Sequence, residues 1–297
     1  MNIKPSIKTA RAGEVRYYDD PMGYLLRSGL AVKVGNGLFV FNGILARLLE
    51  VIDDTTREIA EKAGADQVSV PNILSQKNAS DSQYLSSFRN QAMMLCQCTD
   101  KAGKGYEGMA SPTVCYHYFS SLRGRAAKKN HCVTAVSKCT RKEKGSLDDL
   151  SRLTNFTMRE VVFLGTERYC LDKRDEILKA TINELNRKFD LSYAVATASD
   201  PFFGAENEEK TKAQLMSESK YEVQAKIPFN DSTTSIASFN YHGNVFFKRF
   251  HIKPSDPENG FSGCVGWGYE RILYALAAQK GVDFTSKYYD KLLKTKT

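Results

Sequence analysis

Residues 137–164 read SKCTRKEKGSLDDLSRLTNFTMREVVFL, a pattern typical of a strand, a polar loop and a second strand. Arg141 and Glu143 stand two residues apart, so on a strand their side chains point to the same face. Beyond the loop, Arg152 is followed four residues later by Phe156, which opens an apolar run. Two arginines and a glutamate on a hairpin fit a solvated face as well as a binding site.

The pattern Arg-x-Glu, loop, Arg-x-x-x-Phe resembles motif 2 of the class II aminoacyl-tRNA synthetases, which binds ATP. The resemblance implies that Arg141 holds the α-phosphate, that Arg152 holds the γ-phosphate and that Phe156 stacks on adenine. It also implies that Glu143 bonds the adenine amino group or positions the nucleotide. Guanidinium groups suit phosphate because they present a planar fork of donors.

Residues 263–275 read GCVGWGYERILYA. The series Gly266-x-Gly268-x-Glu270-Arg271 before an apolar helix resembles motif 3 of the same class. There, glycine permits close backbone approach to the nucleotide, and the resemblance places Arg271 on the γ-phosphate. The alternative is a glycine turn before a core helix, with a solvated arginine. The order and distance of the two motifs make the pair specific.

Residues 68–74 (VSVPNIL) and 84–88 (YLSSF) resemble motif 1 and its sequel, which build the dimer interface in class II enzymes. By itself, a proline after β-type residues is ordinary at a strand edge or turn. With this segment the resemblance spans residues 37–285. It implies an α+β fold of the class II synthetase type, an antiparallel β-sheet flanked by helices, in a homodimer.

Three short segments narrow the resemblance: 111–118 (SPTVCYHY), 156–162 (FTMREVV) and 262–266 (SGCVG). They resemble the amino acid:[carrier protein] ligases, which are similar to the catalytic core of the atypical zinc-dependent archaeal seryl-tRNA synthetases. In both groups a Cys, a Glu and a Cys at these positions bind one Zn²⁺, which implies the ligands Cys115, Glu160 and Cys264. Three protein ligands leave a fourth tetrahedral position open, and the resemblance implies that the substrate's α-amino group takes it.

The cysteine spacing alone does not indicate zinc. Cys96-Gln-Cys98 has no matching second pair, and free cysteines are commonly buried simply as packing residues. Three further cysteines match no ligand position and are interpreted as core or surface thiols: Cys132, Cys139 and Cys170.

The chain has 297 residues, of which 42% are apolar, enough for a substantial core. We interpret residues 1–297 as a single catalytic domain, with an N-terminal lead-in over 1–36 and the catalytic core over 37–297. The N-terminus has no apolar signal-peptide region. Seven cysteines fit reduced thiols in a cytoplasm better than a disulfide framework. No run approaches the roughly 18 apolar residues of a membrane helix. We therefore expect a cytoplasmic protein with no membrane partner.

The net charge of +8 suits an acidic or polyanionic partner. In this resemblance the partner would be an acidic phosphopantetheinylated carrier protein, or tRNA. The alternative is a solvated lysine-rich surface. Basic residues cluster in four places: 123–129, 138–144, 173–179 and 291–296. The first cluster and the charged segment 203–219 are candidate docking surfaces for the carrier.

Hydrophobic periodicity predicts helices over 41–65, 171–189 and 272–279, and strands over 220–253. Residues 205–219 are strongly charged and predict a helix or an ordered loop. In the first helix the apolar stripe is Ile44, Leu45, Leu48, Leu49 and Ile52, and the polar side is Asp53, Asp54, Arg57 and Glu58. In the second helix the apolar face is Ile177, Leu178, Ile182 and Leu185.

The resemblance implies an ATP-dependent ligase acting in two steps. The carboxylate of an amino acid attacks the α-phosphate of ATP to form an aminoacyl-adenylate, while Arg141, Arg271 and Mg²⁺ stabilise charge on the phosphates. The phosphopantetheine thiol of a carrier protein then takes the aminoacyl group. Two alternatives remain: aminoacylation of tRNA or a tRNA-like substrate, and a non-catalytic paralogue. We expect no separate tRNA-binding domain, because only 110 residues precede the SPTVCY segment.

Several residues near the motifs allow more than one interpretation. The Mg²⁺ ligands are not evident, because no acidic residue precedes Ser238-Phe-Asn240; Glu222 is one candidate. Asn240 and His242 suit either the substrate site or a structural role, and Trp267 suits either the amino-acid pocket or the core. By analogy, a small amino acid such as glycine, alanine or serine is the expected substrate.

Overall fold

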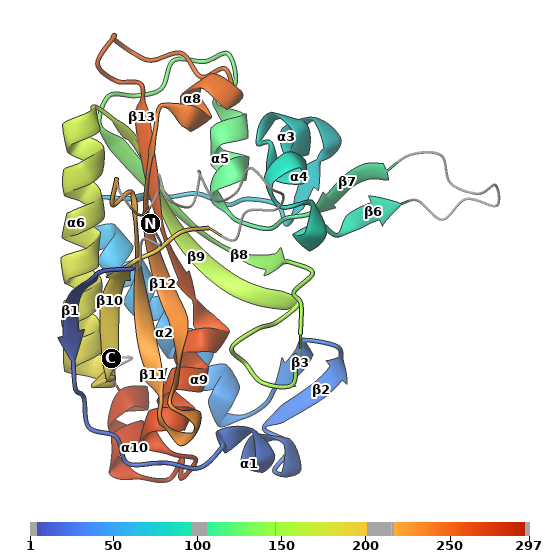
Figure 1. The fold of residues 1–297 in the computed structure, drawn as a ribbon, viewed down its shortest axis with the longest axis vertical. Coiled ribbons are helices and arrows are strands. Elements are labelled where there is room, and N and C mark those ends of the chain that lie inside the picture. The colour runs from blue at the N-terminus through green and yellow to red at the C-terminus, as the bar shows by residue number, and fades with distance from the viewer. Residues whose placement is uncertain (1–4, 97–105, 146, 201–214, 216, 295–297) are drawn as a thin grey trace.

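The computed structural model describes residues 5–96, 106–145, 147–200, 215 and 217–294. Its centre is an eight-stranded sheet (Figure 1), antiparallel throughout except for the β4–β8 pair at one edge. In spatial order the strands are β1 (Ile7–Arg11), β10 (Tyr193–Thr197), β11 (Lys220–Ile227), β12 (Ser232–Gly243), β13 (Phe261–Gly268), β9 (Asn155–Gly165), β8 (His131–Thr140) and β4 (Asp66–Gln67). The predicted antiparallel sheet flanked by helices is therefore present.

Successive residues of β9 enter two different cores, because strand side chains alternate between faces. Val161 and Phe163 belong to the larger core, whereas Val162 and Leu164 belong to the smaller one. Helices that pack in the larger core are α1 (Pro21–Arg27), α2 (Ile44–Lys62), α6 (Glu167–Glu184), α9 (Tyr269–Lys280) and α10 (Lys287–Lys294). Those of the smaller core are α3 (Gln76–Asp81), α4 (Tyr84–Ser87), α5 (Cys115–Ser121) and α8 (Val245–Arg249).

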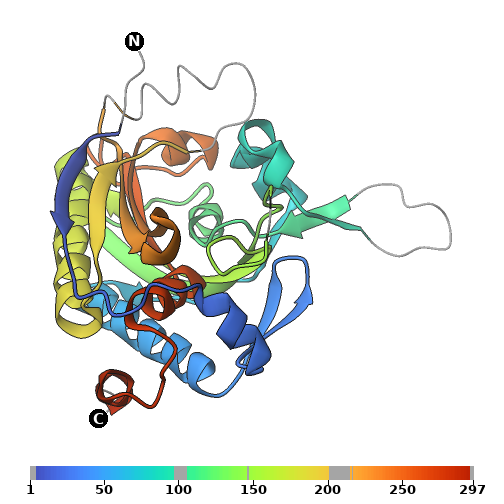
Figure 2. The same cartoon turned by 60° about the horizontal axis from the view of Figure 1, so that its bottom comes forward.

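Two small β-structures project from one side of the molecule, at the right of Figures 1 and 2. One is the hairpin of β2 (Ala31–Gly35) and β3 (Leu38–Phe41). The other is a three-stranded sheet in the order β5 (Ile73–Ser75), β7 (Tyr106–Ala110) and β6 (Met94–Cys96). Among the described residues there are also two 3₁₀ helices, η1 (Arg89–Gln91) and η3 (Pro228–Asn230), and one short π-helix, η2 (Leu185–Phe189).

The first long helix is shorter than the predicted range of 41–65. It begins at Ile44, because Phe41 still pairs with Ala31 in the β2–β3 hairpin, and Gly43 has a φ of 53°, which no right-handed helix contains. The predicted stripe does face the core: Leu45, Leu48 and Ile52 are buried, and Ile44 and Leu49 are partly buried against them.

The lead-in over 1–36 contains the strands β1 and β2 and also a helix, α1. Asp20 caps it by accepting a hydrogen bond from the backbone N–H of Met22 (2.9 Å), and Pro21 occupies the first helical position. This Asp-Pro start is a known helix signal, and the prediction missed it.

Other boundaries differ by a few residues. Helix α6 begins at Glu167 rather than at 171, since the Thr166 hydroxyl caps it by accepting from the Tyr169 N–H (3.1 Å). It continues into η2, which ends at the predicted residue, Phe189. The predicted helix 272–279 extends over Tyr269–Lys280. The predicted strands over 220–253 are β11 and β12, followed by the short helix α8. Most of segment 205–219 lies outside the described residues.

Arg141 and Glu143 do not lie on a strand, which corrects the prediction. Strand β8 ends at Thr140, and the backbone N–H of Arg141 then donates to the Thr154 carbonyl (3.0 Å) as the chain leaves the sheet. Both side chains still enter the same cavity, so the shared orientation comes from the loop rather than from strand periodicity.

A glycine of β13 provides a test of this packing. A Cβ atom at Gly263 would lie 2.1 Å from the Phe163 ring and 2.5 Å from the Asn240 carbonyl oxygen, whereas a Cβ at Gly260 would meet nothing within 4 Å. We predict that Gly263→Ala lowers the free energy of unfolding by about 1–3 kcal/mol, the usual range for overpacking. Gly260→Ala is the matched control, with little change expected in urea denaturation. Equal stability of the two variants would contradict this packing.

Candidate functional site

A cavity of about 880 Å³ opens on the sheet face that carries the smaller core. Its volume is within the range of small-molecule sites. Seven of the predicted site residues line it: Cys115, Arg141, Glu143, Phe156, Glu160, Cys264 and Arg271. The segments 111–118, 156–162 and 262–266, which are far apart in the sequence, therefore all contribute residues to one cavity.

At one end of the cavity, Cys115, Glu160 and Cys264 form a buried cluster in which one ligand atom from each lies within 4.8 Å of the others. Cys115 is the first residue of α5, and Glu160 and Cys264 lie on the adjacent strands β9 and β13. Glu160 pairs with Gly266, so Cys264, two residues away, presents its side chain to the same face.

The donor set suits zinc. Two thiolates and a carboxylate are common ligands of Zn²⁺, and three of them leave one tetrahedral position open. With metal–ligand bonds of about 2.0–2.3 Å, tetrahedral ligand atoms lie about 3.5–3.8 Å apart. The cluster, within 4.8 Å, needs only a small contraction to reach that geometry.

A second layer of polar groups orients the cluster. The Glu160 carboxylate accepts hydrogen bonds from the Thr113 hydroxyl and from the Cys115 backbone N–H (2.7 Å). His242 Nε2 lies 3.4 Å from Cys264 Sγ, and Asn240 Nδ2 lies 3.6 Å from the same sulfur. Partners of this kind fix ligand orientation in metal sites. Asn240 and His242 thus act on Cys264.

Burial and these hydrogen bonds set the acidity of the cluster. Burial raises the pKa of Glu160 to about 7 and raises the pKa of Cys115. The Cys115 thiol, together with His242, lowers the pKa of Cys264 by bonding to its thiolate. Cys264 is therefore the first of the two thiols to ionise, and metal binding would displace the remaining protons.

Two arginines bring positive charge to the cavity, Arg141 and Arg271. Arg141 Nε donates to the Pro112 carbonyl (2.9 Å), and its guanidinium lies 5.3 Å from the centre of the Phe156 ring. Arg271 donates to the carbonyls of Ser151 (2.7 Å) and Ser235 (3.1 Å). Burial and the neighbouring Arg141 lower the pKa of Arg271. Carbonyl partners hold the two guanidinium groups without neutralising their charge, which suits an anionic ligand.

Bare glycine backbone also lines the cavity. A Cβ at Gly266 would lie 3.2 Å from Met158 Sδ, and both Gly266 and Gly268 line the cavity. Phe156 and Glu160 lie four residues apart on β9, which corresponds to roughly 13 Å at about 3.3 Å per residue. The aromatic end and the Cys–Glu–Cys cluster are therefore far enough apart for a nucleotide and a small second substrate.

Arg152 is not brought into the cavity. Its side chain is exposed and donates to the Lys144 carbonyl (3.4 Å), and it is absent from the lining residues. Glu270 lines the cavity but is 1% exposed, and it accepts from both the backbone N–H and the hydroxyl of Thr157 (2.8 Å each). Glu270 therefore links α9 to β9.

Trp267 belongs to the core. It is 1% exposed and its indole N–H donates to the Thr181 hydroxyl of α6 (3.2 Å), on the helix side of the sheet. It is not a cavity residue, which decides between its two interpretations.

Lys220 is a cavity residue that none of the sequence motifs indicated. Its ammonium group is buried and lies 2.6 Å from an Asp200 carboxylate oxygen and 3.1 Å from one of Glu222. Although burial disfavours the charged form, these carboxylates raise the pKa of Lys220. Glu222, a candidate Mg²⁺ ligand, is thus ion-paired. The signal in the sequence was a lysine at an inward position of an alternating strand.

Comparison with known proteins agrees with this site, although no family model matches the sequence. Amino acid–[acyl-carrier-protein] ligase 1 of Bradyrhizobium diazoefficiens is 26% identical over 90% of this chain and 87% of that protein. Type-2 serine–tRNA ligase of Methanopyrus kandleri is 22% identical over 95% of this chain and 61% of that enzyme.

The solved structure of the M. kandleri seryl-tRNA synthetase with A. aeolicus tRNASec has a TM-score of 0.86 at 19% identity, over 99% of this chain and 64% of that chain. The resemblance to the class II synthetases, to the carrier-protein ligases and to the archaeal seryl enzymes is thus confirmed. The chain has the class II synthetase-like fold, and its relatives are ligases of that type. Within the described residues, no helix is both long and apolar enough to cross a membrane.

The acidity of Cys264 is testable in chelator-treated protein. We predict that iodoacetamide at neutral pH modifies Cys264 before Cys115, because only a thiolate reacts and the Cys264 thiolate is stabilised. His242→Ala should slow this reaction. Mass spectrometry of the cysteine peptides measures both rates. Cys139, whose pKa burial raises to about 12, is the internal control. Preferential modification of Cys115 would contradict the geometry.

Proposed function

We propose that this protein activates a small amino acid with ATP and transfers it to the phosphopantetheine thiol of a carrier protein, as an amino acid:[carrier protein] ligase. The observation that carries the proposal is one cavity that brings a buried Cys–Glu–Cys cluster together with Arg141, Phe156 and Arg271. It is supported by a similarity to a carrier-protein ligase that extends over 90% of this chain and 87% of that protein.

In the first step, a carboxylate oxygen of the amino acid attacks the α-phosphorus of ATP and pyrophosphate leaves, which yields the aminoacyl-adenylate. Arg141 contacts the α-phosphate and Arg271 the γ-phosphate, while Phe156 stacks on adenine and Glu143 bonds its amino group. Because both guanidinium groups are held by carbonyls, they stabilise the negative charge that develops on the phosphates. ATP enters as its Mg²⁺ complex.

Cys115, Glu160 and Cys264 would hold zinc, which when bound supplies a Lewis-acid position for the neutral α-amino group of the substrate. Thr113 and His242 keep two of these ligands oriented. Selection for a small amino acid fits a cluster enclosed by buried side chains.

In the second step, the thiol sulfur of the carrier attacks the carbonyl carbon of the adenylate and AMP leaves, giving the aminoacyl thioester. The acidic carrier would dock on the basic cluster 123–129. Within this cluster Arg123 bonds to Asp81 and Lys129 lies 3.5 Å from Asp256. Arg125 and Lys128 are exposed and are our candidates for contact with the carrier. The other candidate surface, 203–219, lies mostly outside the described residues.

We further propose a single catalytic domain that forms a homodimer. The two projecting β-structures lie on one side of the molecule (Figure 2). Their exposed apolar side chains support an interface there: Val32, Val34, Val40, Ile73, Met94 and Leu95. Apolar side chains gathered on one part of a surface often mark an interaction site.

Charging of tRNA is the second candidate function, favoured by similarity to type-2 serine–tRNA ligases and by the net charge of +8. The chain spans 61% of the M. kandleri enzyme, against 87% of the carrier-protein ligase.

Amino-acid-dependent ATP–pyrophosphate exchange tests the first step. We predict exchange with one or a few of the twenty standard amino acids, with glycine, alanine and serine tried first. Arg141→Ala and Arg271→Ala should each lower the rate about 10²–10³-fold, the loss typical of a donor to transition-state charge. Arg168→Ala, which removes an exposed arginine that pairs with Asp172 of the same helix, is the control. Exchange with none of the twenty would remove the main support for the proposal.

The acceptor is then identified with the radiolabelled amino acid. Transfer to a phosphopantetheinylated carrier, in a form released by neutral hydroxylamine, is the expected result. Labelling of tRNA without labelling of any carrier would favour the second candidate function.

The metal assignment has its own test. We predict about one zinc per chain in the purified protein and little zinc in Cys115→Ala and Cys264→Ala, measured by inductively coupled plasma mass spectrometry. Cys170→Ala removes a buried thiol that lies in the larger core and should keep its zinc. If all three variants bind zinc as the parent does, the cluster is not the metal site.

A further inference from the structure

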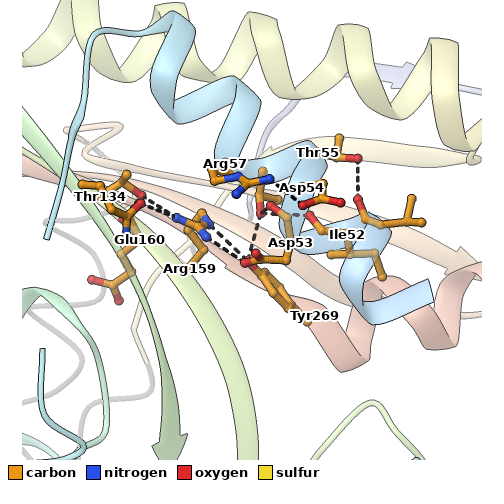
Figure 3. Close-up of polar contacts among 12 residues, drawn as sticks. Ile52, Asp53, Asp54, Thr55, Arg57, Thr134, Arg159, Glu160 and Tyr269 are labelled. Atoms are coloured by element: carbon orange, nitrogen blue, oxygen red, sulfur yellow. Dashed lines mark hydrogen bonds and ion pairs between the residues drawn. The ribbon is translucent and has the colours of Figure 1, made fainter. Parts of the chain in front are cut away.

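A second polar cluster lies directly behind the cavity, on the opposite face of the sheet (Figure 3). Its centre is Arg159, which is 2% exposed. Arg159 precedes Glu160 on β9, so its side chain points toward α2 while the Glu160 side chain points away, as Figure 3 shows. A buried guanidinium requires several partners to offset its loss of hydration.

One branch of the cluster joins β9 to α2 and α9. Arg159 Nη2 donates to Asp53 Oδ1 (2.7 Å), and Arg159 Nε donates to the Tyr269 hydroxyl (3.2 Å). The Tyr269 hydroxyl in turn donates to Asp53 Oδ1 (2.6 Å), which closes a ring of three side chains. Thr56 of α2 lies 3.0 Å from the same hydroxyl. Asp53, expected on the polar side of its helix, thus faces a buried cation.

The other branch joins β9 to β8 and β4. Arg159 Nη1 lies 3.2 Å from Gln67 Oε1 and 3.4 Å from the Thr134 hydroxyl, and it donates to both. The Thr134 hydroxyl donates to the backbone carbonyl of Glu160 (2.9 Å). This branch therefore ends on the peptide group of the residue that enters the metal cluster.

From these contacts we infer that Arg159 is a positioning residue, which sets Glu160 in the metal cluster and, through Tyr269, the start of α9 that carries Arg271. Tyr269 is the first residue of α9 and stands two residues before Arg271. The inference rests on the proposed function, because it assigns Arg159 a role in metal retention and adenylate formation. The three guanidinium nitrogens reach different elements, a geometry that the single nitrogen of lysine cannot reproduce.

A purely structural role is the alternative, since buried ion pairs can often be replaced without loss of function. The chain offers a matched control in Lys280, whose side chain is 1% exposed and pairs with Asp190 (2.9 Å). Lys280 ends the helix that Tyr269 begins, about 16 Å away at about 1.5 Å per residue. Lys280→Met therefore removes a buried cation from the far end of the same helix.

The test compares Arg159→Lys, Tyr269→Phe and Lys280→Met in the full chain. Three quantities are measured: melting temperature, zinc retention against a chromogenic chelator, and kcat and KM of ATP–pyrophosphate exchange. We expect Arg159→Lys to weaken zinc retention and lower kcat about 10–100-fold, the range for partners of metal ligands. Tyr269→Phe should change kcat and the KM for ATP more than zinc retention, because it lies on the α9 branch. Lys280→Met should lower the melting temperature only.

Normal zinc retention and kcat in folded Arg159→Lys would overturn the inference, whatever its melting temperature. If Arg159→Lys does not fold, the kcat and KM of Tyr269→Phe test the inference instead, since this variant loses one hydroxyl and keeps the ring. If the parent protein retains zinc but shows no ATP–pyrophosphate exchange, the proposed reaction is contradicted. Zinc retention in Arg159→Lys would then test by itself whether Arg159 positions Glu160. A parent protein that neither retains zinc nor shows exchange would overturn both the proposed function and the positioning role of Arg159.

Discussion

The two-residue period of β9 is the constraint on which the rest of the structure depends. It sends Arg159 and Glu160 to opposite faces of one sheet, together with apolar neighbours that enter two separate cores. A shift of β9 by one residue would place the guanidinium in the cavity and the carboxylate among apolar side chains. The register is held from both sides, by β8 and by β13. Packing and site geometry are therefore specified together.

The hydrogen-bond partners of the buried and half-buried cations divide these side chains into two kinds of role. Arg141 and Arg271 bond to backbone carbonyls, which orient a guanidinium and leave its charge available to an anion. Arg159 and Lys280 bond to carboxylates, which neutralise them and join elements of the fold. Lys220 has two carboxylate partners inside the cavity, so it contributes less positive potential than its position implies. Charge alone would not distinguish these roles.

The sequence predicted much of the site and less of its surroundings. Arg141, Glu143, Phe156 and Arg271 line the cavity as the motifs indicated, because short motifs with fixed spacing report on local backbone geometry. Arg152 was expected beside them, yet its loop turns it to solvent. Helix α1 was missed because it is one of the shorter helices, and a long apolar stripe is the signal that periodicity detects best.

Glu143 also shows the limit of strand periodicity. The orientation that it shares with Arg141 was predicted, but for a reason that the end of β8 at Thr140 excludes. A local sequence pattern predicts which side chains share a site more reliably than it predicts where a strand ends. The end of a strand depends on tertiary hydrogen bonds, such as that from the Arg141 N–H to the Thr154 carbonyl.

The sequence by itself determined the alternation of β9, the helical stripe of α2 and the motif residues, because these follow from spacing within one segment. Only the tertiary structure decided that Cys115, Glu160 and Cys264 approach within 4.8 Å, and that Asp53, Arg159 and Tyr269 close a ring. These groups come from segments far apart in the chain. Their meeting depends on sheet register and on the burial of two cores, which no single segment encodes.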